Sequence, residues 1–238
     1  DVYQKVNCLL TVNNARKAKQ CGVKQFIQIS TVSVYGKVNS ISYHTPENPM
    51  DSYGWSELHA DNELMKMNVH DFKVAIIRPP MIYGGGNAPG NMMRLIRLVD
   101  KGLPLPFGGI NNRRDFVNIT NFVALLKKVV LTDAVGIMLI SDNRPVSTAE
   151  LVKIIAEKLG KKPRLIRLPS FMLALLKKLR PNEYDKLFGT LTIDCKKTYE
   201  KLQMVPESSI DEGIGEMVTW YLGQKRKFRL LFGLFFDT

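Results

Sequence analysis

Phe26-Ile-Gln-Ile-Ser-Thr-Val-Ser-Val-Tyr-Gly36 decides the fold, because its apolar start predicts a short buried strand and its polar end predicts a loop. The strand is expected over 25–29. A helix is expected over about 52–68, and Lys73-Val-Ala-Ile-Ile77 is a second buried strand that the following two prolines end. A strand, a helix and a strand form a right-handed crossover, so the two strands should be parallel.

The rest of the chain continues as mixed helix and strand. The sequence predicts, in order, a helix over 2–20 with Gly22 as its C-cap, a helix over 91–101, a strand near 115–118, a helix over 120–131, a strand over 137–140, a helix that the capping box Ser147-Thr-Ala-Glu150 begins, and helices over 171–179 and 210–222. We therefore expect an α/β protein.

Two loops follow the predicted parallel strands, over 30–36 and 78–86. In parallel sheets, ligands bind beyond the carboxyl ends of the strands. The candidate site is therefore expected where these two loops meet.

The chain of 238 residues has a formal net charge of +12, much of it in three basic clusters, Lys161–Arg167, Lys177–Arg180 and Lys225–Arg229. Such clusters are typical of a solvated surface, and they also suit an anionic substrate or a membrane surface. No basic motif interleaved with aromatic residues is present, so nucleic acid is not expected as a partner.

The cysteine and histidine residues give no metal-binding pattern. The three cysteines, Cys8, Cys21 and Cys195, are odd in number and lack ligand spacing, which favours a reducing compartment. The three histidines are expected at the surface, and no metal is expected. The start of the chain has no secretory leader and its apolar runs are too short to span a bilayer, so we expect a cytoplasmic protein.

A set of motifs in a fixed order carries a family resemblance. Phe26 to Gly36 is followed by Tyr53-Gly-Trp-Ser-Glu57, by Ile76-Ile-Arg-Pro-Pro-Met-Ile-Tyr-Gly84, and by Asn112-Arg-Arg-Asp-Phe-Val117. Together they resemble the extended short-chain dehydrogenase family of NAD-dependent epimerases and dehydratases. The stretch 78–116 is most similar to bacterial UDP-sugar 4-epimerases of surface-polysaccharide pathways.

The resemblance implies a fold and its division. It implies part of a Rossmann-type doubly wound parallel sheet over 1–90, a smaller mixed α/β substrate-binding lobe over 91–224 that includes some Rossmann elements, and a basic, then apolar tail over 225–238. The Gly-rich turn that holds the cofactor diphosphate in this family is absent from the sequence. We therefore expect the first three or four strands of the sheet to be missing.

The resemblance also implies an active site that uses NAD on a nucleotide-diphosphate sugar. Tyr53 and Thr31 match the catalytic positions, at which the phenol exchanges a proton with a sugar hydroxyl and Thr31 shares that hydrogen bond. Ser30 and Pro80 match positions near the cofactor, and Ser33 is a candidate for substrate contact. Both serines are equally credible as loop-capping hydroxyls.

Glu57 departs from the family pattern, which has lysine four residues after the tyrosine. A lysine there favours tyrosinate and contacts the cofactor ribose, whereas a carboxylate opposes the tyrosinate charge. At about 5 Å and an effective dielectric near ~20, one such pair is worth roughly 3 kcal/mol. We therefore expect Glu57 to raise the pKa of Tyr53 and to leave the chain weakly active or inactive.

Arg114 and Asn91 match family positions that hold the nucleotide. A guanidinium suits a diphosphate through bidentate hydrogen bonds, so Arg114 is the expected diphosphate ligand; the alternative is a surface ion pair with Asp115. Asn91 is expected near the uracil and phosphates, or else as an ordinary N-cap.

The function expected from these residues is nucleotide-sugar epimerisation or dehydration with NAD. The alternative is a catalytically impaired or non-catalytic relative that binds a partner. A homodimer through a four-helix bundle that includes the Tyr53 helix is typical of the family. The tail is expected either to contact a membrane surface weakly or to dock a partner.

Overall fold

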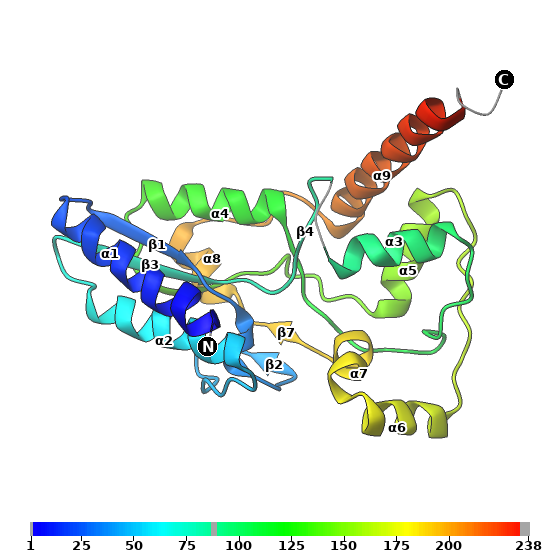
Figure 1. Cartoon of the computed structure of the whole chain (residues 1–238), viewed down its shortest axis with the longest axis horizontal. Helices are drawn as coiled ribbons and strands as arrows, with labels where there is room; N and C mark the ends of the chain where they lie inside the picture. Colours follow the sequence, from blue (N-terminus) through cyan, green and yellow to red (C-terminus); the bar gives the residue numbers. More distant parts are fainter. Residues whose placement is uncertain (1, 87–89, 234–238) are drawn as a thin grey trace.

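The computed structural model describes residues 2–86 and 90–233, apart from the side chains of 182 and 228–233 (Figure 1). In chain order its elements are η1 (Gln4–Leu10, a π-helix), α1 (Thr11–Gln20), β1 (Gln25–Ile29), η2 (Val32–Tyr35, a 3₁₀ turn), β2 (Ser40–Ile41), α2 (Ser52–Lys66), β3 (Lys73–Arg78), β4 (Ile82–Tyr83), α3 (Asn91–Asp100), β5 (Val117–Asn118), α4 (Ile119–Leu131), β6 (Gly136–Leu139), α5 (Thr148–Lys158), α6 (Ser170–Leu179), α7 (Pro181–Phe188), β7 (Thr192–Ile193), α8 (Lys196–Leu202) and α9 (Ile210–Gly233).

The central sheet has the order β1-β3-β6, and both pairings are parallel, as the crossover argument predicts. Every residue of β3 after Lys73 is buried, since this strand has a neighbour on each side. The prediction that β1 is equally buried is wrong. Its residues are only half-buried and Ile29 is 49% exposed, because β1 pairs only with β3 among the described residues.

Helices cover both faces of this sheet (Figure 1). Ala75 and Ile77 of β3 belong to an apolar cluster with Leu125 of α4, whereas Val74 and Ile76 pack with α1 and α2 on the other face. Successive side chains of a strand point to opposite faces, so an all-apolar strand needs a helix on each. The sequence Val74-Ala-Ile-Ile77 therefore dictates the three layers.

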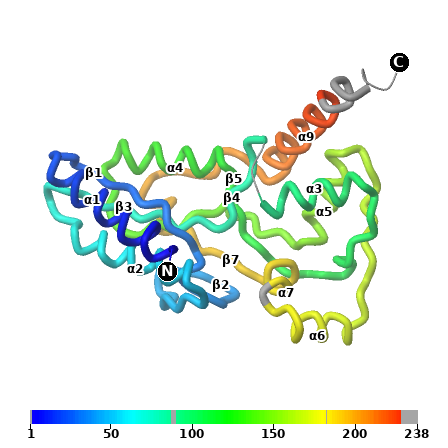
Figure 2. The backbone as a smooth tube through the Cα atoms, in the orientation of Figure 1, coloured from blue at the N-terminus to red at the C-terminus, as the bar shows by residue number. Residues whose placement is uncertain are grey.

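A second apolar cluster lies outside the sheet. It joins α3, α5 and α9, with Ile96, Ile155 and Ile214 fully buried. Figure 2 shows these helices at the end of the molecule away from β1, with α9 extending outward. This end of the molecule therefore has an apolar core of its own, and the division of the chain at residues 90 and 224 stays a prediction.

The element predictions miss α7 and α8 altogether and end α9 too early. We expect this helix over 210–222, but it continues to Gly233. Asp100 holds it in place, since its carboxylate accepts from the Tyr221 hydroxyl at 2.8 Å and from Lys225 Nζ at 2.6 Å. The last tail residues, 234–238, lie outside the described part. None of the helices within it combines the length and hydropathy that a membrane span requires.

Candidate active site

The loops after β1 and β3 meet, as expected for neighbouring parallel strands. Ser30 N donates to the Ile77 carbonyl at 2.8 Å, and Val32 N donates to the Pro79 carbonyl at 3.2 Å. The parallel pairing of β1 and β3 therefore continues into the two loops that follow these strands. Pro80 is buried directly behind them.

Thr31 caps the short η2 turn and stays half-exposed at this edge. Its hydroxyl accepts from Ser33 N at 3.1 Å and donates to the Ser33 hydroxyl at 3.2 Å. Ser33 itself is exposed. Hydroxyl side chains commonly cap turns in this way, so the local turn orients both predicted site residues.

Tyr53 stands in the first turn of α2, which begins because the Asp51 carboxylate accepts from Gly54 N at 2.8 Å. Gly54 lets this turn approach the η2 loop, since a Cβ at that position would lie 2.9 Å from the Ser33 carbonyl oxygen. The Thr31 hydroxyl lies close enough to the Tyr53 phenol to act against the rise of its pKa. The two predicted catalytic side chains are therefore brought together.

Tyr53 has a raised pKa. Burial is the main cause, and the carboxyl of Glu57 adds to it, whereas the Thr31 hydroxyl acts to lower the pKa. The predicted effect of Glu57 is thus confirmed in direction, although burial outweighs it. The ring of Tyr3 packs edge-on against Tyr53, with centroids 5.8 Å apart.

Glu57 lies one helical turn after Tyr53 and is 8% exposed. Its Oε2 atom is buried without a hydrogen-bond partner. Burial, followed by the negative charge of Asp61, raises the pKa of Glu57 to about 7, against a smaller lowering by Gln28. The carboxyl that replaces the expected lysine is therefore partly protonated at neutral pH, rather than permanently anionic as we assume from the sequence.

A buried charged network, which sequence reasoning missed, lies behind these residues. The Asp61 carboxylate accepts from the Ser30 hydroxyl at 2.8 Å and from Arg78 Nε at 3.0 Å. Arg78 Nη1 donates to the Tyr35 hydroxyl at 2.8 Å and to Glu47 at 3.0 Å. Asp61 stands one turn after Glu57 on the same helix, and that spacing was the available signal.

This network changes the interpretation of Ser30. The side chain is 5% exposed and its hydroxyl donates into the network. The Ser30 hydroxyl therefore binds the buried Asp61 carboxylate. The sequence predicts instead that this hydroxyl contacts the cofactor. That contact stays a prediction.

Arg114 is half-buried and bridges to Val146 and Leu191. Its Nη1 donates to the carbonyl oxygens of Asp185 and Gly189, at 2.9 and 3.2 Å, and so holds the end of α7. The alternative of an ion pair with Asp115 is wrong, since that carboxylate is buried and accepts from Ile193 N at 2.8 Å. The diphosphate contact of Arg114 stays a prediction.

Asn91 is exposed at the start of α3, near the loop that follows β4. The alternative that it serves as the N-cap is wrong, because Gly90 holds that place with a φ of 129°. A positive φ of this kind favours glycine, which leaves the Asn91 side chain without a capping role. Its nucleotide contact stays a prediction.

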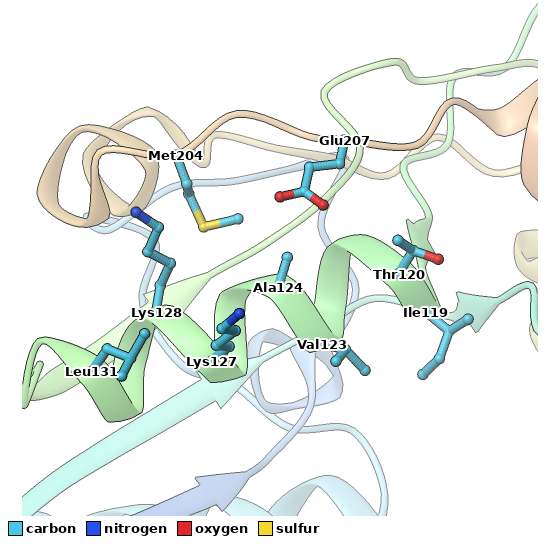
Figure 3. Close-up of a pocket in the computed structure, with 9 residues that line it drawn as sticks. All are labelled: Ile119, Thr120, Val123, Ala124, Lys127, Lys128, Leu131, Met204 and Glu207. Carbon is cyan, nitrogen blue, oxygen red and sulfur yellow. The ribbon is translucent and has the colours of Figure 1, made fainter.

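A separate groove of about 500 Å³ runs along α4 (Figure 3). It is lined by Ile119, Thr120, Val123, Ala124, Lys127, Lys128, Leu131, Met204 and Glu207. No predicted site residue lines it. Within residues 2–86 and 90–233, no three His, Cys, Asp or Glu side chains are grouped closely enough to hold a metal ion.

Comparisons with known proteins identify relatives of the chain and solved structures that share its fold. A UDP-glucose 4-epimerase of Vibrio cholerae is 37% identical over 93% of the chain and 70% of its own length. The structure of UDP-glucuronic acid 4-epimerase from Bacillus cereus in complex with NAD has a TM-score of 0.72 at 22% identity, over 90% of this chain and 64% of that one. MoeE5, solved with UDP-glucose and NAD, has a TM-score of 0.71 at 24% identity, over 92% and 71%.

The two solved structures share the α/β fold of the chain. The chain spans about two thirds of the length of the Bacillus cereus protein. A family model described as "NAD dependent epimerase/dehydratase family" matches residues 1–138, which is more than half of the sequence. With the Vibrio cholerae relative at 37% identity, this match shows that the chain belongs to the NAD-dependent epimerase/dehydratase family.

Proposed function

We propose that the chain carries the proton-transfer and sugar-binding groups of a nucleotide-sugar epimerase or dehydratase. The observation that carries the proposal is the close approach of the first turn of α2, which holds Tyr53, to the η2 turn that Thr31 caps, at the carboxyl edge of the sheet. In this proposal Tyr53 exchanges a proton with a sugar hydroxyl, and Thr31 shares the hydrogen bond. Arg114 and Asn91 hold the nucleotide diphosphate, and Ser33 contacts the sugar.

The residues at this edge fit the nicotinamide and ribose end of NAD. Glu57 Oε2 is buried without a hydrogen-bond partner, which leaves it available for a ribose hydroxyl, and Pro80 follows the end of β3. The chemistry that NAD supplies when bound is reversible hydride transfer with the sugar.

Tyr53→Phe tests this function, with UDP-glucose and NAD as the probes. Removal of the phenol hydroxyl should lower kcat by about 10²–10⁴-fold, the usual contribution of general acid–base catalysis, and should leave UDP-glucose binding unchanged in calorimetry. Tyr221→Phe, which removes a phenol hydroxyl that donates to Asp100, is the matched control and should keep full turnover. Equal turnover of Tyr53→Phe and the unmodified chain would refute the proposal.

The rival function is a family member that binds without turnover, and Glu57 is the observation that favours it. In that case UDP-glucose would bind and no epimerised or dehydrated product would form, with or without the Tyr53 hydroxyl. Product analysis by NMR separates the two functions.

We also propose a homodimer through η1 and α2. The face of the first helical segment exposes Val6, Leu9 and Leu10, each at 53%, and Trp55 of α2 is 47% exposed beside it. Apolar residues at i, i+3 and i+4 form a stripe that a partner helix can cover. Leu9→Glu should convert a dimer to a monomer in light scattering, and a monomeric unmodified chain would contradict this proposal.

The location and the tail stay proposals as well. We propose a cytoplasmic protein, since all three cysteines are free thiols. For residues 225–238 we propose a weak contact with a membrane surface through the basic, then apolar sequence. Deletion of 228–238 would then reduce retention by anionic vesicles.

A further inference from the structure

The helix α6 carries its large apolar side chains on the surface. Phe171, Met172, Leu175 and Leu179 are 71%, 43%, 53% and 69% exposed, and α6 has no buried residue. A helix turns by about 100° per residue, so these four positions lie within an arc of about 100°. They form one continuous outward face, which we call the α6 apolar face.

The opposite side of α6 packs against the apolar cluster of α3, α5 and α9. Leu173 and Leu176 are partly buried against the cluster of the smaller lobe, together with Tyr184 of α7. The Tyr184 ring stacks on Phe188, with centroids 5.1 Å apart, and Phe188 is buried. The α6 apolar face is therefore held outward by the core and is not a loose segment.

The segment around α6 is rich in basic side chains, of which Lys161 pairs with Asp100 and Arg180 pairs with Glu183 of α7. Residues 161–180 contain seven Lys and Arg and no Asp or Glu. Lys177 and Lys178 stand in the last turn of α6, and Arg164, Arg167 and Arg180 flank the helix, all of them exposed. An apolar face bordered by basic side chains is the pattern of a helix that lies in a membrane interface.

We propose that α6 binds the surface of an anionic membrane. Phe171, Leu175 and Leu179 enter the boundary between headgroups and acyl chains, and the basic side chains meet the lipid phosphates. A second copy of the chain is a poorer occupant, because a two-fold contact at this face would bring the basic last turns of the two α6 helices, with Lys177 and Lys178 in each, close together. The proposal does not depend on the proposed catalysis.

The position of α6 connects this surface to the sugar-binding lobe. Figure 1 shows α6 beside α7 at the margin of the molecule, and the end of α7 is the segment that Arg114 holds through the Asp185 and Gly189 carbonyls. Binding at α6 would therefore set Arg114 close to the lipid surface.

Vesicle sedimentation of the full chain tests the proposal. The probes are vesicles of phosphatidylcholine with about a quarter phosphatidylglycerol, and vesicles of phosphatidylcholine alone. We expect retention on the anionic vesicles, weakened at high salt, and a loss of at least tenfold for the double variant Phe171→Glu, Leu175→Glu. The matched control is Val130→Glu, Leu131→Glu, which makes the same charge change on exposed apolar residues of α4 (53% and 70%) and should bind as the unmodified chain does.

Three results would overturn the proposal. The first is equal retention of the α6 variant and the α4 control, with both folded by circular dichroism. The second is retention that disappears only when residues 228–238 are deleted, since binding would then belong to the tail. The third is absence of vesicle binding together with a change of oligomeric state in the α6 variant, since a second copy would then cover the face.

Discussion

Arg78 Nε donates to the Asp61 carboxylate at 3.0 Å, although each side chain is only 1% exposed. Removing one member of such a pair leaves an uncompensated buried charge, which costs about 3–5 kcal/mol. Arg78→Met should therefore lower the free energy of unfolding by about that amount in urea titration. Lys73→Met, at the other end of β3, is the control, since its ion pair with Asp133 is exposed and worth about 0–1 kcal/mol. A loss for Arg78→Met no larger than for Lys73→Met would contradict the interpretation.

Glu57 should make stability depend on pH near neutrality. Its pKa is raised from 4.5 to about 7 in the folded chain, so the protonated form is favoured by folding. This stabilisation is fully present below pH 4.5 and is lost as pH rises through about 7. Thermal unfolding should therefore show a falling Tm between pH 5 and 8, and Glu57→Gln should flatten that slope. Burial raises the pKa of Asp115 to about 6. Asp115 should therefore leave part of the fall of Tm with pH in both the unmodified chain and Glu57→Gln.

Glu57 should also limit turnover. Replacing it by lysine reverses the sign of a charge one helical turn from the Tyr53 phenol, and a pair at about 5 Å is worth roughly 3 kcal/mol. Glu57→Lys should raise kcat by about 10–100-fold and move the basic limb of the pH–rate profile to lower pH. Glu63→Lys is the control on the same helix, where the side chain is exposed, and it should leave kcat unchanged. An identical profile for Glu57→Lys and the unmodified chain would mean that Tyr53 and position 57 are not coupled.

The sequence predicts the sheet core because its signal is local. Strands β1 and β3 and helix α2 follow apolar runs and caps that are visible within a few residues. The two-residue strands β2 and β7 are different, since Ser40 pairs with Thr192 across a long stretch of chain. No periodicity exists in two residues, so pairing of this kind is decided by tertiary contacts alone.

In the candidate site, too, the features set by local sequence could be predicted and those set by distant contacts could not. The juxtaposition of Thr31 and Tyr53 follows from strand ends and a helix start, which the motifs locate. The inward direction of the Ser30 hydroxyl depends on Asp61 and Arg78, which reach it from two other elements. Side-chain direction at such a junction is set by partners distant in sequence, and so it could not be predicted from the loop itself.

The packing of α9 against β4 and β5 gives a last prediction, because two of its glycines differ in their surroundings. A Cβ at Gly213 would lie 2.2 Å from Asn118 Nδ2 and 2.7 Å from Tyr83 Cε2, and both residues are fully buried. Neither can move freely, since the Tyr83 hydroxyl donates to Asp142 at 2.7 Å and Asn118 Nδ2 donates to Ser208 at 3.0 Å. Gly213→Ala should therefore destabilise the protein by about 1–3 kcal/mol, the usual cost of overpacking a core.

Gly215, two residues along the same helix, has only the flexible Lys158 side chain near it, at 3.8 Å. Gly215→Ala should stabilise the chain by up to about 1 kcal/mol, because alanine is the better helix former. Urea unfolding of the two variants should thus give shifts of opposite sign. Shifts of the same sign would mean that α9 does not pack against Tyr83 and Asn118.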